Sequence, residues 1–275
     1  MRWRASFAAF VLLALPPASS GRDQPAEKHL LVVTHAAGFR HDSIPTAEAT
    51  LDAIAKGSGL FDVTFCRTAE DVKRMLVPAF LGGFDGVFFA NTTGDLGIPD
   101  LGAFLDWVAD GHAFLGAHSA SDTYHSAGGD RRFVEMLGAE FDRHGSESQV
   151  AVRVEDPKHP AVASLASPYG VFDEIYEFTD DPRGRVEVLL SLDRHPNDGH
   201  AEAGRPGDFP LSWTKPHGRG RVFYTALGHR GDVWESASFR SHLLGAIRWS
   251  LAAPPKALDG SELERERTGL VRRDR

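Results

Sequence analysis

A histidine stands at the position where several α/β enzymes carry a catalytic nucleophile. His118 follows the short apolar run 113–117 and lies between Gly116 and Ala120, in a G-x-H-x-A pattern. This spacing matches the G-x-S-x-G elbow, in which small residues let a strand and the following helix approach around a sharp turn. Imidazole transfers protons near neutral pH and binds metals through a neutral nitrogen. The pattern predicts a functional histidine at a strand end, although an ordinary loop containing a histidine would look the same.

Further histidines and an asparagine lie just after other apolar runs. His35 and His41 belong to the polar turn after residues 30–34, Asn91 follows residues 84–89, and His229 follows residues 221–225. We predict that His35, His41, Asn91 and His229 bind substrate, and that His35 and His229 are alternatively ligands of a divalent metal. Each of them taken alone is more often a hydrogen-bonded turn residue than a ligand.

Two carboxylates and two aromatic residues complete the candidate site. Asp122 or Glu174 is expected to act as the carboxylate partner of His118 in acid/base catalysis. Tyr124 and Trp213 offer flat rings with a polar atom, which can stack on a sugar, although such rings more often pack in a core.

Several familiar chemistries do not fit the sequence. A thiol nucleophile is not expected, because the one cysteine, Cys66, lies within a predicted strand without the elbow spacing. Ser119 and Ser121 are out of register with the nucleophile position of a serine hydrolase, and the chain has no H-E-x-x-H zinc motif. Glu174 and Glu177, three apart on a predicted strand, would point to opposite faces, so they do not form a glycosidase carboxylate pair.

The elements that must position these residues are predicted from hydrophobic patterning. Residues 30–34, 61–66, 84–89 and 113–117 read as strands, and predicted helices alternate with them along the chain. This alternation favours an α/β fold with a mostly parallel, doubly wound sheet that has helices on both faces. The carboxyl ends of parallel strands lie at one edge, so we expect His35, Asn91 and His118 to share one cleft.

The second half of the chain predicts antiparallel additions to that sheet. Strands are expected at 149–154, 172–178, 186–192, 211–213 and 221–225, with a hairpin turn at Gly218 and Gly220. Residues 194–208 read as a long loop. Ser236 is a candidate cap for a last helix that runs from about residue 239 to 251.

The two ends of the sequence and its net charge further limit the possible functions. Residues 1–20 have a basic start, an apolar run and small residues before Gly21, which predicts a signal peptide and a secreted or periplasmic protein. Residues 253–275 are expected to form a charged, disordered tail. The net charge of −8 argues against binding to nucleic acid or an anionic membrane, and no segment predicts a membrane span.

Five segments together resemble the ThuA-like, or trehalose-utilisation, family, which has the class I glutamine amidotransferase-like fold. They are VVTHAAGFRHDS at 32–43, FDGVFFANTTGD at 84–95, GAHSASDTY at 116–124, DEIYEF at 173–178 and GRGRVFYTALGHRGDVW at 218–234. The resemblance covers residues 28–252 and implies carbohydrate metabolism. An amidotransferase has cysteine where this chain has His118, so glutamine hydrolysis is not implied.

These observations favour a sugar-active enzyme, a hydrolase, lyase or isomerase, that acts on trehalose-type or keto-disaccharide substrates by histidine and carboxylate acid/base chemistry. The identity of any metal is open, although a divalent ion fits the histidines. A non-catalytic carbohydrate-binding or partner-binding domain is the alternative. The expected partner is a small carbohydrate, and the sequence leaves a homo-oligomer open.

Overall fold

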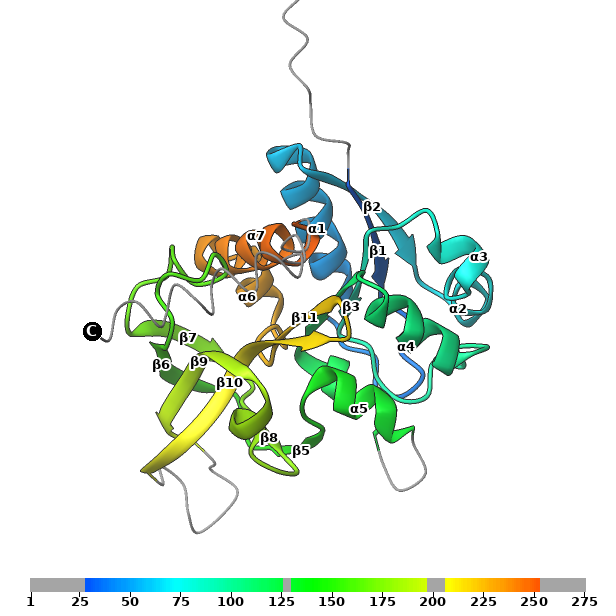
Figure 1. Cartoon of the computed structure of the whole chain (residues 1–275). Helices are drawn as coiled ribbons and strands as arrows, with labels where there is room; N and C mark the ends of the chain where they lie inside the picture. Colours follow the sequence, from blue (N-terminus) through cyan, green and yellow to red (C-terminus); the bar gives the residue numbers. More distant parts are fainter. Residues whose placement is uncertain (1–27, 126–129, 197–205, 253–275) are drawn as a thin grey trace, which may run out of the picture.

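A nine-stranded sheet forms the centre of the protein (Figure 1). The structure, a computed structural model, describes residues 28–125, 130–196 and 206–252. The sheet order is β2-β1-β3-β4-β11-β10-β9-β6-β7, and a second, two-stranded sheet pairs β5 with β8. The predicted signal peptide and charged tail lie outside the described residues.

The parallel half of the sheet contains the four strands predicted for it and β11, which the sequence placed among the antiparallel additions but which pairs in parallel with β4. These strands are β2 (Phe61–Cys66), β1 (Lys28–Val33), β3 (Gly86–Ala90), β4 (Ala113–Ala117) and β11 (Gly220–Thr225). Neighbours along this order pair in parallel. All residues of β3 and β4 are buried, as expected for strands covered on both faces.

Helices cover both faces of this half, which confirms the doubly wound α/β prediction. Figure 1 shows one group of helices on one face, namely α1 (Ile44–Ser58), α6 (Gly231–Glu235) and α7 (Ala237–Leu251). The other face carries α4 (Leu101–Ala109) and α5 (Arg131–Leu137). Two short helices, α2 (Ala69–Met75) and α3 (Pro78–Leu81), connect β2 to β3. The predicted cap is confirmed, because the Ser236 hydroxyl accepts from the Phe239 amide at 3.2 Å.

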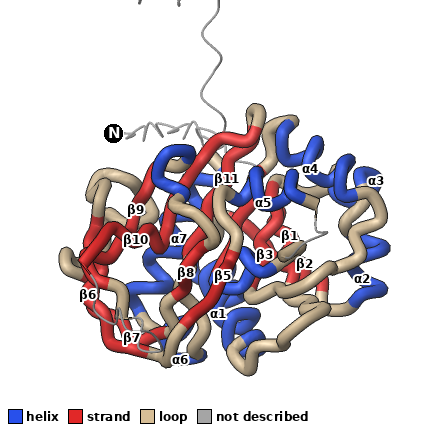
Figure 2. The backbone as a smooth tube through the Cα atoms, turned by 90° about the horizontal axis from the view of Figure 1, so that it is seen from below, coloured by secondary structure: helices blue, strands red, loops and turns tan. Residues whose placement is uncertain are grey.

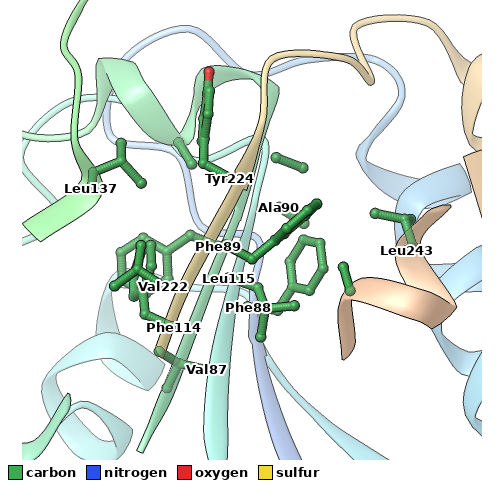
Figure 3. Packing of buried hydrophobic residues seen from close by; sticks show 14 of the residues in the cluster. Val87, Phe88, Phe89, Ala90, Phe114, Leu115, Leu137, Val222, Tyr224 and Leu243 are labelled. Atoms are coloured by element: carbon green, nitrogen blue, oxygen red, sulfur yellow. The ribbon is translucent and has the colours of Figure 1, made fainter. Parts of the chain in front are cut away.

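The core between the sheet and its helices is rich in aromatic side chains. Figure 3 shows Phe88, Phe89 and Phe114 packed among aliphatic residues of neighbouring strands. On the face covered by α4 and α5, the Phe89 ring lies 5.9 Å from Phe104 and 5.8 Å from Phe133. Ring pairs at these separations stabilise the core beyond the contribution of their buried apolar area. The strands that end at the site are therefore held in a well-packed core.

The antiparallel half extends the sheet beyond β11, as predicted. Its members are β10 (Pro206–His217), β9 (Glu187–Arg194), β6 (Ser148–Val154) and β7 (Tyr169–Asp173). β10 and β11 form a hairpin in which Gly218 adopts a φ of +58°, a conformation that favours glycine. The tube view in Figure 2 places these strands together at one end of the molecule. No helix in the described residues is long and apolar enough to cross a bilayer.

Two sequence predictions about this half were wrong. Residues 172–178 do not form one strand, because β7 ends at Asp173 and β8 (Tyr176–Phe178) pairs instead with β5 (Phe141–His144). Glu174 therefore lies where the chain leaves one sheet for another. The predicted loop at 194–208 is shorter than expected, since β10 already begins at Pro206. Residues 197–205 lie outside the described part.

Candidate functional site

The predicted elbow is present at the end of β4. His118 adopts a φ of +48° and begins a 3₁₀ helix, His118–Asp122. A Cβ on Gly116 would lie only 3.1 Å from the Ala120 Cβ, so the turn needs small residues at both positions, as the sequence suggested. The Tyr224 hydroxyl donates to the His118 carbonyl at 2.7 Å. This bond, between buried groups, holds a backbone conformation that non-glycine residues rarely adopt.

Three histidines and a glutamate converge beside this elbow. One donor atom from each of His41, His118, Glu174 and His229 lies within 4.8 Å of the donors of the other three. The His118 Nε2 atom is 3.1 Å from His41 Nε2, 3.3 Å from His229 Nδ1 and 3.5 Å from Glu174 Oε2. His229 Nδ1 is also 3.3 Å from Glu174 Oε2. We call these four residues the His/Glu cluster.

The backbone fixes which nitrogen of His118 faces the cluster as an acceptor. His118 Nδ1 lies 3.0 Å from the carbonyl oxygen of Ala226, which follows β11. A carbonyl only accepts, so Nδ1 carries the proton and donates. Complete burial lowers the pKa of His118, against the opposing effects of Glu174 and Ala226, so the ring is neutral. Its Nε2 lone pair therefore points into the cluster, where the Tyr176 hydroxyl, 2.9 Å away, donates to it.

The other members of the His/Glu cluster also have polar partners, which contact the ring nitrogen or carboxylate oxygen that faces away from the cluster. His41 Nδ1 lies 3.4 Å from Ser119 Oγ. His229 Nε2 is 3.5 Å from a carboxylate oxygen of Glu147. Glu174 Oε1 is 2.9 Å from His144 Nδ1. Partners of this kind fix ring orientation and tautomer in protein metal sites.

The pKa directions leave three members of the cluster, His41, His118 and Glu174, deprotonated at neutral pH. Burial, together with the nearby His118 and His229, lowers the pKa of His41 to about 3. Burial by itself would raise the pKa of Glu174, but its histidine neighbours His118, His229 and His144 outweigh burial, so the pKa is lowered. Neutral imidazoles and an ionised carboxylate are the forms that bind metals. The set can hold one divalent cation.

The comparisons with known proteins agree with this fold. The family model described as ThuA, trehalose utilisation, matches residues 29–250. The chain belongs to the ThuA family.

Solved structures similar to this ThuA-family chain include two putative ThuA-like proteins. A putative ThuA-like protein from Bacteroides uniformis is 24% identical with a TM-score of 0.65, over 86% of this chain and 95% of that one. One from Parabacteroides merdae is 18% identical with a TM-score of 0.67, over 85% and 94%. The β-galactosidase of Bacillus circulans is similar over 83% of this chain and 32% of its own, at 11% identity and a TM-score of 0.54. These likenesses show the shared fold. A comparison with curated proteins found no match.

The one cysteine of the sequence lies away from the elbow. Cys66 is buried at the end of β2, and burial raises the pKa of its thiol to about 12. It stays protonated and unreactive at neutral pH. The elbow of this ThuA-family chain presents the His118 imidazole instead.

Not every predicted site residue joins the cluster. Asn91 is buried beside it, where its amide donates to Ser43 Oγ at 3.0 Å and to the Gly228 carbonyl at 2.9 Å. It therefore ties the loop after β1 to the loop that carries His229. His35 follows β1 at the same edge of the sheet, is half-buried, and belongs to neither the cluster nor the adjoining cavity.

Trp213 does not form a sugar-stacking surface. Its side chain is fully buried, its Nε1 donates to the Leu137 carbonyl at 2.8 Å, and its ring packs 4.5 Å from that of Tyr224. Tyr124 is likewise buried, with its ring against Phe133 and its hydroxyl accepting from the Ile98 amide. Both rings stabilise the core, because strands β10 and β11 and the turn after β4 lie inside the molecule.

The carboxylate partner of His118 is Glu174, not Asp122. Asp122 has a pKa raised by burial and offset by His125, and the four-residue cluster does not include it. The break between β7 and β8, which the sequence did not predict, lets Glu174 face the elbow.

Two further groups that support the site were missed. Asp173 is fully buried and accepts from the amides of Gly228 at 2.7 Å and Arg230 at 3.3 Å, so it fixes the loop on either side of His229. Burial raises its pKa to about 7 despite these bonds. His144 binds Glu174 from β5. The hydrophobic patterning gave no signal for β5, the strand that positions His144.

A cavity of about 430 Å³ opens beside the His/Glu cluster. Its lining includes His41 and His229, whereas His118 and Glu174 lie behind them. The location gives a small molecule access to the cluster from one side. Complete burial of His118 favours a role as a ligand rather than as a residue that exchanges protons directly with a substrate.

Proposed function

We propose that the chain is a metal-dependent enzyme of carbohydrate utilisation that acts on a trehalose-type disaccharide or its keto derivative. The observation that carries the proposal is the lone pair on His118 Nε2, which must face the cluster because Nδ1 holds the proton. It faces the Tyr176 hydroxyl and nitrogens of His41 and His229 at 2.9 to 3.3 Å, and one lone pair cannot accept from all of them. A cation bound among the three imidazoles would instead take one lone pair from each of His41, His118 and His229, in place of the hydrogen bond from Tyr176.

The distances between the ligand atoms of the cluster also favour a bound metal ion. A tetrahedral ion with metal–nitrogen bonds of about 2.0–2.1 Å separates its ligand atoms by about 3.3–3.4 Å. Four of the six donor separations in the cluster lie between 3.1 and 3.5 Å. Three imidazoles and one carboxylate suit a first-row divalent transition metal, with Zn²⁺ the first to test, rather than Mg²⁺ or Ca²⁺, which prefer oxygen ligands.

The chemical role follows from the type of ion. A divalent metal held by these four residues would polarise a carbonyl or hydroxyl oxygen, or activate water, if the oxygen entered as a fifth ligand. The protein's own contribution is to hold the donors through Ala226, Ser119, Glu147 and His144, and to admit substrate through the cavity beside His41 and His229. Family membership supports carbohydrate as the substrate class.

The test combines metal content with turnover. The full chain would be stripped with a chelator, reloaded with Zn²⁺, Mn²⁺ or Co²⁺, and incubated with trehalose and 3-keto-trehalose while NMR follows the sugars. We expect one metal per chain and conversion that needs the metal. Binding of the sugar without conversion in any metal form would favour the carbohydrate-binding alternative. Equal conversion by stripped and loaded protein would reject the metal.

We also propose that the protein works outside the cytoplasm. The support is the basic, apolar and small-residue order of residues 1–20. Amino-terminal sequencing of the exported protein should begin near Gly21, and an intact Met1 would contradict the proposal.

A further inference from the structure

The cavity beside the His/Glu cluster is lined by one large apolar side chain, which we call the apolar wall, and by several charged side chains, which we call the charged wall. Its lining also includes the cluster residues His41 and His229. The side chains that distinguish its walls are Phe39, Asp42, Glu147, Arg230 and Asp232. Its volume, about 430 Å³, is within the range of small-molecule sites.

The apolar wall is a phenyl ring held open to solvent. Phe39 is 68% exposed, more than any other large hydrophobic residue in the described ranges. Its ring meets the edge of His41 at a centroid distance of 4.9 Å. The Thr93 hydroxyl donates to the Phe39 carbonyl at 2.8 Å, and the Ala37 amide donates to the Thr93 carbonyl at 2.9 Å, so the loop is fixed. A flat apolar face in a set position, next to the reacting centre, suits a ligand with an apolar face of its own.

The charged wall is also held in place. Arg230 pairs with Glu147, donates from Nε to Asp232 at 2.9 Å, and lies 5.0 Å above the Phe172 ring. These contacts occupy the one guanidinium of the wall. Asp42 is exposed at the rim of the same cavity. Three carboxylates against one already paired cation make the walls net negative, which repels anions and offers acceptors to hydroxyl groups.

We infer that this cavity is a subsite for one ring of a neutral, unphosphorylated sugar, which stacks its apolar face on Phe39 and donates hydroxyls to Asp42 and Glu147. The inference rests on the proposed function, since it names the substrate class of the same site. Phe39 sets affinity for the ring. The carboxylates set the discrimination against phosphorylated and acidic sugars.

The experiment is calorimetric titration of the full chain with trehalose and with trehalose 6-phosphate, in zinc-loaded and zinc-stripped protein. Trehalose should bind at least about tenfold more tightly than its phosphate in both forms. Phe39→Ala should weaken trehalose binding about three- to tenfold, whereas Phe39→Tyr should restore it. Leu60→Ala, at an exposed apolar residue before β2, is the matched control and should change nothing.

The outcomes separate this subsite from the metal proposal. Because Phe39 donates no metal ligand, Phe39→Ala should bind zinc as the wild type does. Asp42→Asn should narrow the preference for trehalose over its phosphate. Wild-type affinity in Phe39→Ala, or equal binding of the two sugars, would overturn the inference even if zinc binds. Absence of zinc binding with a Phe39-dependent trehalose affinity would reject the metal and retain the subsite.

Discussion

The substitution His118→Asn should remove one of the four ligand atoms of the cluster without disrupting the fold. Asparagine tolerates the positive φ of this residue better than other non-glycine residues. Its side-chain amide can replace Nδ1–H as the donor to the Ala226 carbonyl, which His118 contacts at 3.0 Å. What disappears is the Nε2 lone pair, and with it the acceptor for the Tyr176 hydroxyl.

The size of the effect follows from ligand linkage. Loss of an outer partner of a metal ligand costs about 10- to 100-fold in affinity, so loss of a ligand should cost at least about 100-fold. At a zinc concentration 100 times the wild-type Kd, the metal stabilises the wild type by about 2.7 kcal/mol and the variant by only about 0.4 kcal/mol. The unpaired Tyr176 hydroxyl should lower the metal-free stability by about 1 kcal/mol, or about 2–4 °C in Tm.

The assay is thermal unfolding with and without zinc, together with measurement of bound metal. His242→Asn is the matched control, because His242 is also fully buried and its Nδ1 lies 2.8 Å from a backbone carbonyl, that of Ala161, away from the cluster. The control should keep the full zinc-induced rise in Tm. A His118→Asn protein that shows the same rise as wild type would refute the assignment of His118 as a ligand.

Three other predictions follow from the same contacts. Tyr224→Phe removes the shorter of the two hydroxyl hydrogen bonds to the His118 carbonyl, leaving the one from Ser121 at 3.4 Å, and should cost about 1–3 kcal/mol in urea unfolding; an unchanged midpoint would contradict the role of the Tyr224 bond at the elbow. Trp213→Phe should lower stability by about 1–3 kcal/mol and leave the trehalose Kd unchanged, since the ring is core; weaker sugar binding in fully folded protein would restore the stacking role. Burial lowers the pKa of His242 to about 4, below the usual histidine value of about 6.5, so the unfolded state binds the extra proton and stability should fall by up to about 3 kcal/mol as the pH drops from about 6.5 to 4; His242→Asn should show a shallower loss over that window than the wild type.

Local patterning was enough to predict the parallel half of the fold. Runs such as those that became β3 and β4 have no polar alternation, because a strand covered on both faces needs apolar side chains on both. The small residues around His118 predicted the elbow for a local steric reason, which the close approach of Gly116 and Ala120 confirms. The positions of His41, Asn91 and His229 after strands followed from the same topology.

The identity of the cluster's carboxylate depended on contacts between distant segments. Residues 172–178 alternate like a single strand, and nothing local shows that β7 pairs with β6 while β8 pairs with β5. That change of partner brings Glu174 to His118 across 56 positions of sequence, and the same packing buries Trp213. The sequence by itself determined which strands are buried and where the chain turns, since those depend on neighbouring residues. Tertiary structure decided which polar groups meet and which aromatic rings stay accessible, because both depend on strand pairing between segments far apart in the chain.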